Sequence, residues 1–349
     1  MASWDLLVDR KDLRKTLVVS AQPRALADGE VRLAVERFSL TANNITYGSM
    51  GDAFGYWKFF PAPEGLGRIP VWGFATVTES RAPDAPVGLR LFGYLPMSTS
   101  FVMQLAKSRG GFVDRAPHRA ELPPTYNAYA EAPADPLDDH RALLRPLLMT
   151  SFLLDDFLGE DEGLSSLVLS SASSKTALGL AWFARARGRE VIGLSSPANA
   201  RLIEGLGLYD KVLTYDAVDG LKTRGPAAFV DFAGDRGGTA KVHAALDSDL
   251  TRSIIVGATH WEAGRGGQVE IAGPTPTLFF APDQIRKRMA DWGPGEVESR
   301  FDVALRAFVG DSPWLNLVRH QGQQGLTDAY HMVLEGRVRP QDGHIIAPA

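Results

Sequence analysis

Hydrophobic and polar positions alternate in the first third of the chain. Residues 30–40, EVRLAVERFSL, place apolar and polar side chains in turn over the first half of the segment, as a half-buried β-strand does. Residues 74–80 (FATVTES) and 89–96 (LRLFGYLP) predict further strands, and Pro, Gly and Asp turns separate them. The pattern therefore favours a barrel-like or sandwich-like β-rich module, followed by a Pro-rich connection at residues 121–136.

The pattern changes after this connection. Residues 138–158 carry apolar side chains at helical spacing, and Pro146 either starts a new helix there or kinks a single one. Short apolar strands then alternate with amphipathic helices, which implies parallel βαβ units whose sheet is covered on both faces. The expected strands lie at residues 166–171, 190–195, 211–216, 227–234 and 253–261, with helices at 175–188 and 197–207. The end of the chain predicts a short strand, a helix ending at Gly336 and a terminal strand.

Composition narrows the class of protein. The chain has 349 residues, of which 45% are hydrophobic and 22% charged, so it is long enough for two folded domains. Its net charge of -4 argues against binding to nucleic acid. The absence of cysteine excludes disulfides, thiolate zinc sites and cysteine nucleophiles. No apolar run is long enough to cross a bilayer and the first residues do not resemble a signal peptide, so we expect a cytoplasmic protein.

The segment LVLSSASSKTALGL, residues 167–180, joins the first of these strands to a helix through small polar residues. An ATP-binding P-loop would place glycines at the positions of Leu169 and Ser174, ahead of Lys175 and Thr176, so the sequence does not favour that loop. A dinucleotide-binding turn needs small residues before a helix whose N-terminal amides face the pyrophosphate. A serine that simply caps the helix explains the same residues. The turn alone leaves these last two interpretations open.

The following strand favours dinucleotide binding. In such folds the residues after the second strand contact the adenosine ribose, where an acidic residue selects NAD and small polar residues beside a base accept the 2′-phosphate of NADP. Here Ser195 and Ser196 end the strand, and Arg201 lies one helical turn further on. We therefore predict NADP(H) as the cofactor. The expected contacts of its pyrophosphate are the turn residues Ser171, Ala172, Ser173, Ser174, Lys175 and Thr176.

With these features, the sequence resembles the medium-chain dehydrogenase/reductase superfamily, specifically its zinc-independent quinone oxidoreductase and enoyl reductase branch. Residues 166–216 carry the main resemblance, with a serine-bearing phosphate turn, the VIG strand and the segment LGLYDKVLTYD. Other segments resemble the family in the same order along the chain, so the likeness covers nearly its full length. They are GEVRLAVERFSLTANNITYG, GRIPVWGFATVTES, LFGYLP and GLTDAYHMVLEGRVRPQDGHII.

This resemblance implies an α/β fold in which a Rossmann doubly wound parallel sheet is joined to a GroES-like β-rich substrate domain. It places the substrate domain at residues 1–137, the NADP-binding domain at 138–285 and a segment returning to the substrate domain at 286–349. Tyr215 resembles the family tyrosine near the NADP ribose, and His260, at the end of a parallel strand, is expected to meet the nicotinamide. The resemblance also implies a homodimer, with PTLFF as a candidate edge strand.

The chain departs from the metal-dependent members of that superfamily. Their Gly-His-Glu triplet is Gly73, Phe74 and Ala75 here, and no cysteine is available for the remaining zinc ligands, so we expect no metal. Without a metal to polarise a carbonyl, an activated alkene or a quinone is the easier hydride acceptor. We expect a small apolar or aromatic substrate.

Candidate catalytic residues lie in the loop TANNITYGSMGDAFGYWKFF, which resembles the substrate-binding loop of the related reductases. The candidates are Asn43, Asn44, Tyr47 and Tyr56 in this loop and Tyr94 after the LFG strand. We expect the asparagines to hold the nicotinamide ring or orient the substrate, and a tyrosine to donate a proton. An aromatic cluster that merely closes the barrel explains the same tyrosines. A non-catalytic protein, which binds NADPH as a sensor or scaffold or does not bind it, explains the missing glycines.

Overall fold

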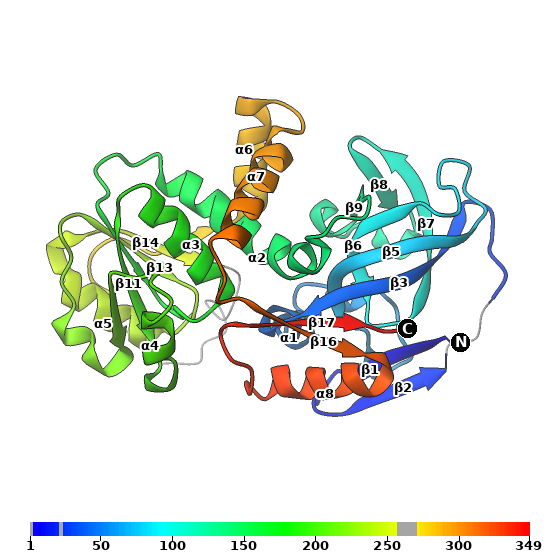
Figure 1. The fold of residues 1–349 in the computed structure, drawn as a ribbon, viewed down its shortest axis with the longest axis horizontal. Coiled ribbons are helices and arrows are strands. Elements are labelled where there is room, and N and C mark those ends of the chain that lie inside the picture. The colour runs from blue at the N-terminus through cyan, green and yellow to red at the C-terminus, as the bar shows by residue number, and fades with distance from the viewer. Residues whose placement is uncertain (1–2, 21–23, 257–270) are drawn as a thin grey trace. The chain divides into compact units, whose positions relative to one another are not determined.

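The computed structural model describes residues 3–20, 24–256 and 271–349. Contacts divide the chain into two compact units (Figure 1). The first combines the residues up to Pro146 with Leu315–Ala349, and the second is Leu147–Trp314. Residues 286–314, expected in the returning segment, lie in the second unit, where they form most of helix α6 (Ala281–Trp292) and all of helix α7 (Glu296–Gly310).

The first unit is built around a closed β-barrel. Its large sheet has the strand order β16-β17-β3-β5-β6-β9-β8-β7, and β3 also pairs with β7, so the strands from β3 to β7 form a ring. The strands are β3 (Glu30–Leu40), β5 (Pro70–Ser80), β6 (Arg90–Pro96), β7 (Ser100–Ser108), β8 (Gly111–Asp114), β9 (Ala128–Glu131), β16 (Asn316–Gln321) and β17 (Asp342–Ala347). A small antiparallel sheet joins β2 (Thr16–Ser20), β1 (Trp4–Asp9) and β4 (Leu66–Gly67). Helices α1 (Ala42–Ser49) and α8 (Gly322–Leu334) belong to the same unit.

The three strands predicted in the first third of the chain are confirmed as β3, β5 and β6. The expectation of a simple connection at residues 121–136 is wrong. This segment contains the 3-10 helix η3 (Pro124–Tyr126) and strand β9, which pairs with both β6 and β8 and so helps to close the barrel. Its prolines lie at the start of η3 and beside the strand, where no ladder hydrogen bond is lost.

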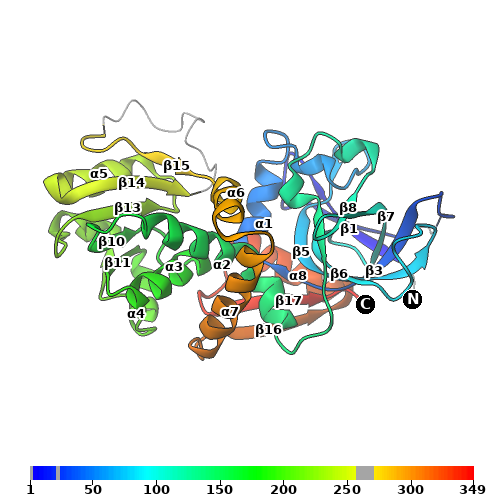
Figure 2. The same ribbon diagram turned by 90° about the horizontal axis from the view of Figure 1, so that it is seen from above.

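The second unit is a doubly wound parallel sheet (Figure 2). Its strand order is β12-β11-β10-β13-β14-β15, so the first strand in sequence lies in the middle and the order reverses between β10 and β13. This is the Rossmann order. The strands are β10 (Ser166–Leu169), β11 (Glu190–Ser195), β12 (Lys211–Thr214), β13 (Ala227–Asp231), β14 (Leu250–Val256) and β15 (Thr277–Phe279).

Helices cover both faces of this sheet, as the apolar strands predict. In β10, Leu167 and Leu169 pack with α2 (Asp138–Leu158), α3 (Lys175–Ala186) and α4 (Pro197–Glu204). Val168, between them, packs on the other side with α5 (Arg236–Leu246) and the 3-10 helix η4 (Tyr215–Gly220). Side chains alternate between the two faces of a strand, so a continuous apolar run is needed when both faces are buried. No helix among the described residues is long and apolar enough to cross a membrane.

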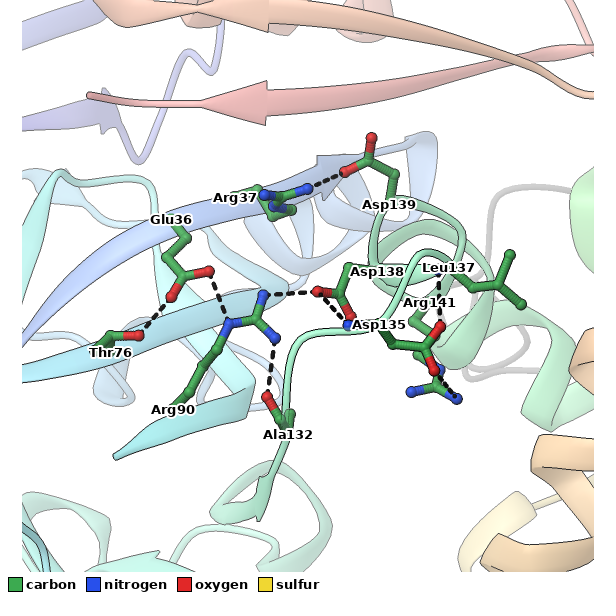
Figure 3. Close-up of polar contacts among 10 residues, drawn as sticks. All are labelled: Glu36, Arg37, Thr76, Arg90, Ala132, Asp135, Leu137, Asp138, Asp139 and Arg141. Atoms are coloured by element: carbon green, nitrogen blue, oxygen red, sulfur yellow. Dashed lines mark hydrogen bonds and ion pairs between the residues drawn. The ribbon is translucent and has the colours of Figure 1, made fainter. Parts of the chain in front are cut away.

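Helix α2 carries the chain from the first unit into the second. It is a single helix that contains Pro146, so the alternative of two separate helices is wrong. A network of ion pairs holds its first turn to the barrel (Figure 3). The Arg90 guanidinium donates to Asp138 at 2.8 Å and to Glu36 at 2.8 Å, and it lies over the Phe74 ring.

The next residue of α2, Asp139, makes a second clamp. Arg37 of β3 donates to one carboxylate oxygen at 2.8 Å, and Arg319 of β16 donates to the other at 2.8 Å. Acidic residues in a first turn also interact favourably with the positive end of the helix dipole. The strand that returns from the second unit and the helix that leaves the first are thus fastened at one carboxylate.

We expect Arg90→Met to lower the free energy of unfolding of the first unit by about 2–4 kcal/mol. The change keeps an apolar stem but leaves two largely buried carboxylates without their partner, which is costly. Urea unfolding measures the loss. The control is Arg81→Met, which removes an exposed ion pair with Asp28 and should cost less than about 1 kcal/mol. Equal losses in the two variants would contradict the anchoring role of Arg90.

Candidate functional site

The turn between β10 and α3 contains a left-handed residue although it lacks glycine. Ser171 adopts a left-handed conformation with φ of 45°, a region that usually favours glycine. Ser174 is the N-cap of α3, and its hydroxyl accepts a hydrogen bond from the Ala177 amide at 3.2 Å. The buried Tyr209 hydroxyl donates to the Ala172 carbonyl at 2.7 Å. These bonds hold the turn in place and leave α3 to begin at Lys175.

A buried serine and a buried aspartate join the two strands at which the sheet order reverses. The Ser170 hydroxyl donates to Asp231 at 2.7 Å and accepts from the Phe232 amide at 2.8 Å. Asp231 also accepts from the Ala233 amide at 2.8 Å and from the Thr239 hydroxyl at 3.2 Å. Ligands of open α/β sheets bind at this carboxyl edge. The bond therefore fixes the spacing of the two strand ends that flank such a ligand.

The structure brings Tyr215 to the predicted turn. Its hydroxyl accepts a hydrogen bond from the Ser171 amide at 2.8 Å. The Asn199 side chain, on α4, reaches the Ser173 hydroxyl at 3.5 Å. The segments that follow β11 and β12 therefore both contribute side chains to this turn.

The predicted 2′-phosphate residues lie just beyond β11. The Ser195 hydroxyl is buried and has no hydrogen-bond partner among the described residues, whereas Ser196 is exposed and forms the N-cap of α4. Arg201 is exposed on α4. Lys175 and Thr176 are half-buried in the first turn of α3.

A small pocket opens at the carboxyl end of β13. It is lined by Asp231, Gly234, Arg236, Thr239, Ile255, Ile271 and Pro276. The expected nicotinamide contact His260 lies outside the described residues. The sequence signal for Asp231 is its position in the segment VDFAG, at the end of an apolar strand.

In the first unit, tyrosines from four separate elements come together. They are Tyr47 on α1, Tyr56 on the 3-10 helix η1 (Tyr56–Lys58), Tyr94 on β6 and Tyr126 on η3. The Tyr47 ring centroid lies 4.7 Å from that of Tyr56 and 5.5 Å from that of Tyr94, and Tyr126 lies 5.1 Å from Tyr94. We call these residues the tyrosine cluster. The structure thus unites all three tyrosines that were expected to be catalytic and adds Tyr126, which the sequence interpretation missed because its segment looked like a linker.

Two N–H groups reach the Tyr47 hydroxyl. Asn43 donates to it from its side-chain amide at 2.7 Å, and the Trp72 indole donates at 3.3 Å. Asn44 has a different role. Its side chain accepts a hydrogen bond from the Thr41 backbone amide and donates one to the Pro70 backbone carbonyl. The structure therefore separates the two asparagines, and Asn43 is the one that contacts the cluster.

Burial raises the pKa of every member of the cluster. The pKa values of Tyr47, Tyr56, Tyr94 and Tyr126 all lie above the ordinary value of a phenol, chiefly because desolvation penalises the charged phenolate. The hydroxyls are thus protonated at neutral pH and can donate hydrogen bonds. The Tyr94 hydroxyl is fully buried and has no hydrogen-bond partner among the described residues. A buried group of this kind marks a place where a ligand atom or a water can bind.

Comparison with known proteins bears on the fold that carries both candidate sites. A family model described as "Protein of unknown function (DUF2855)" matches residues 38–339. No curated protein has a sequence that matches this chain.

Solved structures are similar over the whole chain. The structure of CurA from Vibrio vulnificus in complex with NADPH superimposes with a TM-score of 0.66, at 12% sequence identity, over 99% of each chain. The CurK enoyl reductase gives 0.62 at 12% identity over 100% of each chain. A Bacillus thuringiensis protein named as an NADPH:quinone reductase gives 0.64 at 13% identity over 100% of each chain. These similarities confirm the expected fold, a Rossmann sheet joined to a GroES-like β-rich domain.

We expect Ser171→Gly to leave the free energy of unfolding within about 1 kcal/mol of the wild type, because glycine adopts the left-handed conformation without a steric cost. Ser171→Val should lower it by about 2 kcal/mol or more, since a β-branched residue is strongly disfavoured there. Urea unfolding measures both. Ser173→Val is the control, because its backbone is outside the left-handed region. Equal midpoints for Ser171→Val and the wild type would show that the turn does not need this conformation.

Proposed function

We propose that this chain, which belongs to the DUF2855 family, is an NADPH-dependent oxidoreductase that reduces a quinone or an alkene conjugated to a carbonyl without a metal. One observation carries the proposal. A turn with a left-handed residue precedes the N-terminus of α3 at the point where the Rossmann strand order reverses. Pyrophosphate binds at such a helix N-terminus in dinucleotide-binding proteins.

The residues of the second unit fit the phosphates of NADPH. Ser171, Ser173 and Ser174 bring amides and hydroxyls to the start of α3, where the helix dipole favours an anion. Ser195 and Arg201 supply a buried hydroxyl and an exposed cation after β11, where the 2′-phosphate is bound in related folds. No acidic residue stands there to prefer NADH. The similarity to a structure that holds NADPH supports the same cofactor.

The tyrosine cluster fits the acceptor side of the reaction. Bound NADPH would supply a hydride to an electron-poor carbon, and the substrate oxygen would gain negative charge. Neutral phenols in a desolvated place can donate hydrogen bonds to that oxygen and then give it, or the adjacent carbon, a proton. We assign proton donation to Tyr47, and hydrogen bonding to the substrate to Tyr94 and Tyr56. The aromatic surroundings favour a small apolar or aromatic substrate.

A second function is a non-catalytic protein that binds NADPH as a sensor or scaffold. The observation that favours it is the Ser171 amide, which already donates to the Tyr215 hydroxyl. If that bond persists when the nucleotide is present, one of the pyrophosphate donors is lost.

The decisive experiment combines binding and turnover. Calorimetric titration should show NADPH binding at least about tenfold tighter than NADH, with no binding of ATP. Arg201→Ala should remove that preference, because it removes a charge-assisted contact to the 2′-phosphate. Lys211→Ala is the control, since this exposed cation lies at the opposite, amino end of β12. Absence of any nucleotide binding would contradict the proposal.

Turnover then separates the two functions. An oxidoreductase should oxidise NADPH steadily with at least one member of a panel of enones and quinones, followed at 340 nm. Tyr47→Phe should lower kcat by about 100-fold, in the range that general acid catalysis contributes. Tight NADPH binding without turnover on any acceptor would favour the sensor.

We also propose that the protein is a homodimer. Strand β15 is the edge of the second sheet, and one side of its backbone has no strand partner among the residues that the structure describes. Leu278 and Phe280 are more than half exposed. Exposed apolar edge strands readily pair with a second copy. Light scattering should give twice the chain mass, and Leu278→Lys should shift it toward the monomer. A monomeric wild type would contradict this assignment.

A further inference from the structure

Trp72 lies beside the tyrosine cluster by virtue of sheet pairing. In β5 it stands directly opposite Tyr94 of β6. Its ring centroid is 5.1 Å from that of Tyr94 and 6.1 Å from that of Tyr126, and it stacks on Phe92 at 5.9 Å. The backbone ladder and these ring contacts fix the direction of the indole. The orientation of the Trp72 ring therefore directs the indole N–H at the Tyr47 hydroxyl.

The hydrogen bonds at Tyr47 determine what its hydroxyl can do. An indole nitrogen is only ever a donor, so the 3.3 Å contact with Trp72 uses one lone pair of the phenolic oxygen. The Asn43 amide, at 2.7 Å, uses the other. With both acceptor positions filled, the remaining bond that Tyr47 can make is donation of its own proton.

We infer that Trp72 is a positioning residue that, together with Asn43, holds the Tyr47 hydroxyl as a dedicated proton donor and stabilises the phenolate that donation leaves. The inference rests on the proposed reductase function. In the step concerned, the substrate enolate formed by hydride addition takes the Tyr47 proton; the O–H bond of Tyr47 breaks, a C–H or O–H bond forms on the substrate, and Tyr47 becomes a phenolate. Solvent then returns the proton.

The hydrogen bonds that these two N–H groups donate to Tyr47 become stronger during this step. A hydrogen bond to an ion is roughly twice as strong as one between neutral groups. Trp72 and Asn43 thus stabilise the phenolate more than the phenol, and both lower the pKa of Tyr47 against the larger opposing effect of burial. Interactions that strengthen as charge develops accelerate a reaction, whereas equal binding of both states does not. Trp72 therefore acts on kcat rather than on substrate binding.

The inference is tested by Trp72→Phe in the full-length protein with NADPH and an enone or quinone acceptor. Phenylalanine keeps an aromatic ring in the cluster and removes only the N–H donor. We expect kcat to fall about tenfold and KM to change less than about threefold. Proton transfer becomes slower relative to hydride transfer, so the solvent deuterium isotope effect on kcat should rise and the effect of deuterium at C4 of NADPH should fall.

Matched variants distinguish positioning from packing. Trp182→Phe is the control, because it removes the hydrogen bond that another indole N–H donates to Asp311 in the second unit. It should leave kcat and both isotope effects unchanged. In a Tyr47→Phe background, Trp72→Phe should cause no further loss, because Trp72 acts through Tyr47. Trp72→His retains a ring N–H, so it should keep more of the wild-type kcat than Trp72→Phe does. A second variant at this position also means that the test does not depend on whether one variant folds.

The outcomes separate this inference from the proposed function. Turnover that is impaired by Tyr47→Phe but unaffected by Trp72→Phe would overturn the role of Trp72 and leave the reductase function standing. An equal loss from Trp72→Phe with and without Tyr47 would make its role structural and would also overturn the inference. No turnover of any acceptor by the wild type would overturn both.

Discussion

Ion pairs hold the first turn of helix α2, where the chain leaves the barrel. Asp138 and Asp139 open helix α2, and arginines from β6, β3 and β16 bind their carboxylates. The helix dipole alone would add little at a surface, but these carboxylates are largely buried, so each needs its partner. Because Asp139 binds an arginine from the returning strand as well, one residue fastens both the outgoing and the incoming chain. The returning strands β16 and β17 therefore join the sheet beside β3 although the whole second unit separates them in sequence from the barrel strands.

The second unit shows how a turn with a left-handed residue can be built without glycine. Glycine is usual there because the left-handed backbone carries no steric penalty without a side chain. Here Ser171 adopts that conformation, and hydrogen bonds from neighbouring groups hold the turn: the Tyr209 hydroxyl to Ala172, and the Ser174 cap to α3. The cost of one strained residue is of the order of 1–2 kcal/mol, comparable to the gain from one or two such bonds. Serines in this turn are thus compatible with the shape that a pyrophosphate needs.

The first unit places several phenols where water has little access. Burial keeps them protonated, which suits donors to a substrate that gains negative charge and would not suit bases. Tyr94 contributes a buried hydroxyl without a partner, and Tyr47 contributes one whose acceptor positions are filled. A packing cluster alone would not need either arrangement, since phenylalanine fills the same space without a polar atom to satisfy.

Local patterns in the sequence determined the elements, and the tertiary structure decided which of them meet. The periodicity of residues 30–40 predicted β3 with the bounds that the structure has, because a period-2 pattern reflects burial on one face. The period-3.6 pattern of residues 138–158 predicted helix over the span of α2 but did not decide whether Pro146 divides it. The resemblance along the chain predicted a doubly wound Rossmann sheet, and the structure shows its strand order. Neither could show that Ser170 bonds Asp231, 61 residues away, or that Trp72 reaches Tyr47. Such contacts depend on strand order, register and barrel closure, which leave no local pattern. For the same reason Tyr126 looked like part of a linker until the pairing of β9 carried it into the cluster.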